Sequence, residues 1–107
     1  MSFPSDETGQ VLAEMQHAGI DLTVSHDVVF FHLFEQQSDA QAMADFIEKN
    51  IPQAIINVHP DETPNVWDLD CIITMIPSYD AIVKQEADFE QLANKFSGYN
   101  DGWGVEA

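Results

Sequence analysis

The sequence predicts one α+β domain over residues 1–107: a two-layer sandwich with a four-stranded antiparallel sheet and an additional N-terminal helix. Three observations lead to this fold class. Residues 27–34, which read DVVFFHLF, are β-branched and aromatic and lie between polar residues, as expected of a strand. Two further segments that combine helix and strand patterns follow it. An amphipathic helical pattern precedes it.

The strand over 27–34 is expected to be central in the sheet. Strand side chains alternate between two faces, and here Val28, Phe30, His32 and Phe34 share one face while the apolar residues 29, 31 and 33 share the other. A strand that is apolar on both sides needs cover on both sides. We expect the first helix, or alternatively a second copy of the chain, to cover the face that the other helices leave open.

The first helix is expected to begin at Ser5 and to end at Gly19. Ser5 is a suitable N-cap, and acidic residues follow it in the first turn, where the helix dipole favours them. Glycine is a common residue just beyond a helix C-terminus. The apolar stripe of this helix consists of Val11, Leu12, Met15 and Ala18.

The second helix is expected to start at a capping box formed by Ser38 and Gln41, and to stop at Asn50 before a proline. Its apolar stripe is Met43, Phe46 and Ile47. Strands are predicted over 53–58 and 66–76, separated by a polar loop over 59–65 that contains two prolines.

Ser78 is placed to cap the third helix, whose apolar stripe is Ile82, Phe89, Leu92 and Phe96. Ser97 and Gly98 are expected to close this helix, and residues 99–105 to form the last strand. The six elements after the first helix therefore follow the split βαβ order of ferredoxin-like folds.

Charge is the unusual property of this sequence. Three Lys and Arg residues stand against nineteen Asp and Glu residues, a formal net charge of -16. Such a surface repels phosphate backbones and anionic membranes, so we expect neither direct nucleic-acid binding nor membrane binding. The acidity fits either a basic protein partner or a need for solubility alone. No signal peptide or membrane span is apparent, and the lone Cys71 fits a reducing cytoplasm.

Few residues suggest chemistry. The four histidines, His17, His26, His32 and His59, show no short metal-ligand spacing, and His32 and Cys71 both fall on apolar strand faces typical of a core. Asp61, Glu62, Asp68 and Asp70 gather near one hairpin end, where they could bind a hard cation or form a solvated strand edge. We expect no cofactor, no metal and no catalytic residue.

The C-terminal segment carries a resemblance. Residues 89–96, FEQLANKF, lead into residues 99–104, YNDGWG. This pattern is similar to the end of the RraB family, regulators of ribonuclease E activity, in which a "QLA-x-KF" helix end precedes a strand close to "YDGWG". The resemblance extends more loosely over most of the chain. The sequence departs from the pattern by an inserted Asn100 and by ending three residues after Gly104.

The resemblance implies a ferredoxin-like fold and a non-enzymatic, cytoplasmic bacterial protein that inhibits ribonuclease E by binding its C-terminal scaffold, a basic partner. Within the motif, Tyr99, Asp101 and Trp103 are candidate partner contacts; Tyr99 and Trp103 could equally pack onto the sheet. Other functions stay open: an acidic module for another basic protein, such as an immunity protein or a nucleic-acid mimic, or a small metal-dependent enzyme. The chain is expected to be a monomer or a homodimer.

Overall fold

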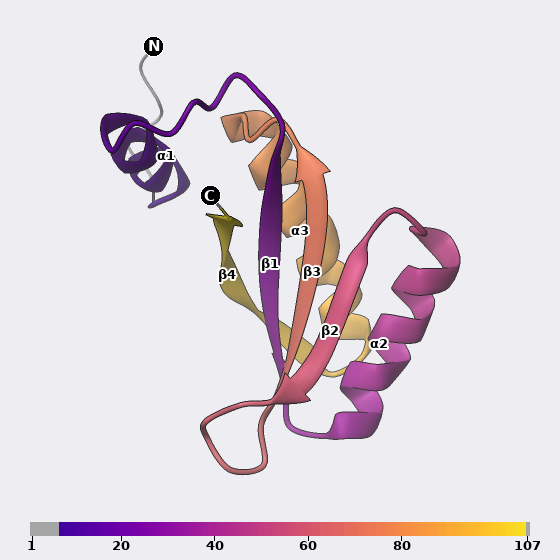
Figure 1. Cartoon of the computed structure of the whole chain (residues 1–107). Coiled ribbons are helices and arrows are strands. Elements are labelled where there is room, and N and C mark those ends of the chain that lie inside the picture. Colours follow the sequence, from indigo (N-terminus) through magenta and orange to yellow (C-terminus); the bar gives the residue numbers. More distant parts are fainter. Residues whose placement is uncertain (1–6, 107) are drawn as a thin grey trace.

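The computed structural model of the chain describes residues 7–106 and confirms the predicted fold class. Four strands form one antiparallel sheet in the order β2-β3-β1-β4, and three helices accompany it (Figure 1). The elements in chain order are α1 (Glu7–His17), β1 (His26–Phe34), α2 (Gln37–Asn50), β2 (Ile55–Pro60), β3 (Trp67–Met75), α3 (Tyr79–Lys95) and β4 (Gly98–Glu106).

The core lies between the sheet and the two helices α2 and α3, which cover one face of it (Figure 1). Phe30 and Phe34 of β1 are fully buried on this helix-covered face, and the Phe30 ring packs against that of Phe89 in α3 at a centroid distance of 5.4 Å. Met43 and Ile47 of α2 complete the other half of the core. Burying side chains of this size stabilises the fold by about 1.5–3 kcal/mol each.

The opposite sheet face, here called the open face, has no described helix across it. The helix α1 packs against α3 and lies to one side, near the end of β4, instead of covering the sheet as expected (Figure 1). The register places the following residues on the open face: Asp27, Val29, Phe31 and Leu33 of β1, Asp68, Asp70, Ile72 and Thr74 of β3, Ile55, Asn57 and His59 of β2, and Tyr99 and Gly104 of β4.

The helices α1 and α2 end where the sequence predicts, but α2 does not begin where it was expected. Gly19 follows α1 with a φ of 96°, a conformation that glycine adopts without strain. The N-cap expected at Ser5 lies outside the described residues. The capping box predicted at Ser38 is wrong: α2 begins at Gln37, its N-cap Gln36 makes no side-chain bond, and the Gln41 amide donates to Asp45 within the helix.

Two further expectations need correction. β2 runs to Pro60, so the first two residues of the predicted loop belong to the strand. A proline is tolerated here because β2 is an edge strand, where a missing N–H can face solvent. In α2, Phe46 is not buried with its predicted stripe; it is 43% exposed, and its ring lies 6.0 Å from that of Phe96.

The third helix is capped as predicted, since Oγ of Ser78 accepts a hydrogen bond from the backbone N of Ala81 at 3.3 Å. At its other end, Ser97 takes the left-handed conformation with φ 65°, and Gly98 is already the first residue of β4. Gly98 is buried against the ring of Phe34, which occupies the space that a Cβ would need. Glycine is therefore required there for close packing.

Candidate protein-binding site

The open face brings together two groups of predicted site residues that lie about thirty positions apart in the sequence. His59 of β2 stands opposite Asp68 of β3, which stands opposite Leu33 of β1, which stands opposite Tyr99 of β4. Directly opposite residues of an antiparallel sheet share a face. One row across the sheet therefore begins with the imidazole and carboxylate of β2 and β3, passes over Leu33, and ends at the ring of Tyr99, which is 46% exposed.

The neighbouring row repeats this arrangement. Asp70 of β3 stands opposite Phe31 of β1, and Phe31 stands opposite the part of β4 where Asp101 and Gly102 are found. Asp70, Phe31 and Gly102 are each partly exposed, while Asp101 is exposed. Asp68 and Asp70 on one side and the C-terminal motif on the other thus flank an apolar strip of β1, formed by Phe31 and Leu33.

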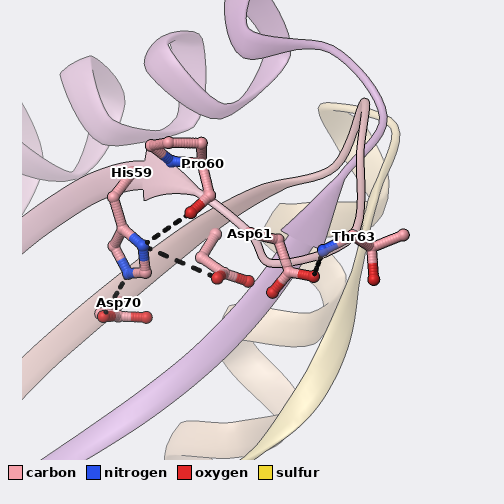
Figure 2. A network of polar contacts seen from close by, with 6 residues as sticks. His59, Pro60, Asp61, Thr63 and Asp70 are labelled. Atoms are coloured by element: carbon pink, nitrogen blue, oxygen red, sulfur yellow. Dashed lines mark hydrogen bonds and ion pairs between the residues drawn. The ribbon is translucent and has the colours of Figure 1, made fainter.

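A histidine and two carboxylates form a polar network at the β2 side of this face (Figure 2). Nε2 of His59 donates to Oδ2 of Asp70 at 3.0 Å, and Nδ1 lies 3.3 Å from the carbonyl oxygen of Pro60 and 3.7 Å from Oδ2 of Asp68. Both ring nitrogens thus face oxygen acceptors only, which suits the protonated imidazole. The two carboxylates are 18% and 20% exposed, whereas the imidazole is 48% exposed.

The electrostatics of this network follow from its geometry. The hydrogen bond to Asp70 raises the pKa of His59, helped by the Pro60 carbonyl and both carboxylates. Burial raises the pKa of Asp68 to about 6, and a hydrogen bond to Asp61 together with the Asp61 charge contributes to the same shift. Asp68 therefore keeps its proton to a higher pH than an isolated surface aspartate does.

The two loop acids have different positions. Oδ2 of Asp61 accepts a hydrogen bond from the backbone N of Thr63 at 2.9 Å, and this bond is the main reason that the pKa of Asp61 is lowered (Figure 2). The backbone N of Asp61 donates to the carbonyl of Val66, which closes the loop. Glu62 is exposed at the tip. Asp61 thus shapes the loop and also touches the network, while Glu62 adds charge beside it.

The C-terminal motif is divided between the two sheet faces. Opposite Phe31, β4 inserts two residues, Asp101 and Gly102, where regular pairing needs one, which is a β-bulge. Tyr99 precedes the bulge and lies on the open face, whereas Trp103 follows it, stands opposite Phe30, and packs against the core on the helix-covered face. The three residues predicted as one contact are therefore not on one surface.

The inserted Asn100 has a structural role at this bulge. Its Oδ1 accepts a hydrogen bond from the backbone N of Gly102 at 2.9 Å. Gly102 has a φ of 100°, which side-chain-bearing residues rarely adopt. The residue that departs from the family pattern thus holds the bulge of this chain in place.

The predicted core positions are confirmed. His32 is 1% exposed, its ring meets the Phe89 ring edge-on at 5.8 Å, and burial lowers its pKa to about 4. Its Nδ1 has no hydrogen-bond partner within residues 7–106. Cys71 is fully buried, and burial raises the pKa of its thiol to about 12, the opposite of what a nucleophile needs.

Among residues 7–106, no three His, Cys, Asp or Glu side chains are grouped so that they could hold a metal ion. In the same range, none of the helices is both long and apolar enough to span a bilayer.

Sequence reasoning predicted the apolar strip of β1 on the open face, but it missed the aliphatic pair beside the acids and the role of His59. Ile55, at 58% exposed, stands opposite Ile72, so an aliphatic pair borders the acids. His59 was assigned to a loop. The alternation of residues 55, 57 and 59 with 56 and 58 could have revealed both, had the strand been extended by two residues.

Fold and site together define a ferredoxin-like α+β domain with an uncovered, acidic sheet face. A protein-family model described as "Regulator of ribonuclease activity B" matches residues 5–105, nearly the whole chain. The chain therefore belongs to the RraB family, whose name denotes regulation of a ribonuclease. A comparison with curated proteins gave no match.

Proposed function

We propose that this protein is a non-enzymatic regulator of ribonuclease E that lowers RNA cleavage by binding the enzyme's basic C-terminal scaffold. The observation that carries the proposal is the family match over residues 5–105. In this proposal the protein acts through surface contact in the cytoplasm.

The open face is the surface that we assign to this contact. It combines exposed apolar side chains, such as Ile55 and Tyr99, with the carboxylates of Asp68 and Asp70. Interfaces commonly join an apolar centre to a polar rim. An uncovered apolar patch on a protein with a formal net charge of -16 favours a partner that offers both apolar and basic groups.

Electrostatic attraction is expected to act mainly on the association rate. Complementary fields speed encounter between oppositely charged surfaces, and added salt screens them over about 8–10 Å. A titration calorimetry experiment with the ribonuclease E scaffold of the same organism, run at low and at physiological salt, tests the proposal. Micromolar or tighter binding that weakens with salt, together with slower cleavage of an RNA substrate, is the expected result.

A charge variant locates the contact. Neutralising Asp61, Glu62, Asp68 and Asp70 together, as Asn or Gln, should slow association and flatten its salt dependence. The control neutralises four acids that are exposed on the helices covering the other face, namely Asp45, Glu48, Asp80 and Glu90. It changes net charge equally, so equal effects of both variants would remove the hairpin acids from the interface. The absence of any binding by the wild type at low salt would refute the proposed function.

A further inference from the structure

A pocket of about 580 Å³ lies at the outer edge of β4, where this strand bulges. Phe31 lines it from the open face and Trp103 from the helix-covered face, and Glu86 of α3 and Asp101 of the bulge contribute carboxylates. This volume is in the range of sites that enclose small ligands or side chains.

The bulge residues Asn100, Asp101 and Gly102 form one wall of this pocket. Regular pairing would continue the β4 edge past Phe31, but the extra residue bends the strand and leaves the edge uneven. The Asn100 side chain and the positive φ of Gly102 hold that bend. On the other side, α1 closes the pocket through Thr8 and Val11. Elements from both ends of the chain therefore build the walls.

The two carboxylates have no internal cation. Glu86 and Asp101 have no hydrogen-bond or ion-pair partner for their carboxylates among residues 7–106, and no lysine or arginine lines the pocket. The nearest lysine in sequence to Glu86 is Lys84, and its Nζ pairs with Asp88 at 2.9 Å. Residues two apart on a helix point in different directions. The negative charge at the pocket is therefore available to a ligand.

We propose that this pocket binds a guanidinium group, presented by an arginine side chain of a basic protein partner. This inference rests on the proposed function in one respect: the partner is basic. A guanidinium is planar and weakly hydrated, so it stacks on one aromatic ring, here that of Trp103, and donates two parallel hydrogen bonds to a carboxylate. A lysine ammonium can use the charge but not the stacking and the paired donation.

Fluorescence of Trp103 tests the pocket directly. The chain contains two tryptophans, so the substitution Trp67→Phe leaves Trp103 as the reporter. The probes are a nine-residue Gly/Ser peptide with three arginines, the same peptide with lysine, and the same peptide with citrulline, a neutral isostere of arginine. N-acetyl-arginine amide distinguishes a free guanidinium compound from one carried by a peptide.

We expect the arginine peptide to bind at least about fivefold more tightly than the lysine peptide, and the citrulline peptide to bind more weakly still. The double substitution Glu86→Gln with Asp101→Asn should weaken arginine-peptide binding by about tenfold or more. The control, Glu48→Gln with Glu90→Gln, removes the same charge from exposed helix positions and should change it less than twofold. Circular dichroism verifies that each variant is folded.

The outcomes separate this inference from the proposed function. Equal binding of the arginine and citrulline peptides would overturn the inference that the pocket binds a guanidinium group. An equal loss of arginine-peptide affinity in the pocket variant and the control variant would overturn it as well. If the pocket variant binds the ribonuclease E scaffold like the wild type, the pocket is overturned and the proposed function stands. If the wild type binds the arginine peptide selectively but not the scaffold, the pocket stands and the proposed function fails.

Discussion

The imidazole of His59 on the edge strand β2 and the carboxylate of Asp70 on the neighbouring strand β3 are joined across the open face, with Nε2 and Oδ2 3.0 Å apart. This bond and the nearby Asp68 place the only cationic group of the network between two acids. At pH values where His59 is protonated, the network is neutralised in part. The acidity of the open face therefore depends on pH.

Replacing His59 tests this dependence. Since its pKa is raised in the folded state, the stability gained from its protonation is fully present below the unfolded value of about 6.5 and is lost as pH rises through the folded pKa. The variant His59→Gln should lose up to about 1 kcal/mol in the free energy of unfolding at pH 6, and less at pH 8.5. Urea denaturation measures both.

The control for this substitution is His17→Gln at an exposed position of α1. A difference between wild type and His59→Gln that is the same at both pH values would show that protonation of His59 does not stabilise the network.

Asp68 should titrate near pH 6 in a carboxyl NMR titration, because burial and the hydrogen bond to Asp61 favour its protonated form. The substitution Asp61→Asn should lower the pKa of Asp68 towards its ordinary value without restoring it, since burial remains. Glu62→Gln removes an equal charge from the same loop and should leave the Asp68 titration nearly unchanged. An Asp68 pKa near 4 in the wild type would contradict this account.

His32 should make the fold sensitive to acid. Its folded-state pKa is about 4 and its unfolded value is about 6.5, so the unfolded chain binds more protons as pH falls between these values. This group alone should cost about 3 kcal/mol of stability between pH 6.5 and pH 4. His32→Met, which keeps an apolar side chain in the core, should flatten that part of the stability profile.

His26→Gln serves as the comparison for His32→Met, because His26 is the first residue of the same strand and is only partly buried. If both variants keep the acid sensitivity of the wild type, other groups cause it.

Gly98→Ala should destabilise the protein by about 1–3 kcal/mol, because the new methyl group would occupy the position of the Phe34 ring. Gly104→Ala is the matched control in the same strand. A Cβ there would have its nearest contact at 3.8 Å, from Phe31, which is an ordinary van der Waals distance. Thermal unfolding should therefore separate the two variants by several degrees. Equal melting temperatures would show that Phe34 can move aside without cost.

The thiol of Cys71 should not react with a thiol reagent in the folded protein, because it is buried and its pKa is raised to about 12. Labelling should occur in urea at the unfolding transition. Stoichiometric labelling without denaturant would place Cys71 in an accessible position.

Much of the fold could be predicted because local patterns decide it. The alternation in β1, the spacing of Ile82 and Phe89 in α3, and the Ser78 cap all act over a few residues and survive in the structure. The predictions that failed concerned competing local options. Ser38 can cap a helix, but α2 begins two residues earlier, with Gln36 as its N-cap. Pro60 can break a strand, but at a sheet edge it does not.

The sequence by itself determined the order of elements, the buried positions of His32 and Cys71, and the excess of negative charge. Only the tertiary structure decided which charges meet, because the pairing of β2 with β3 brings His59 to Asp68 and Asp70. It also divided the C-terminal motif. Strict alternation would put Tyr99 and Trp103 on one face, but one extra residue at the bulge reverses the faces after it, so Trp103 packs on the core side.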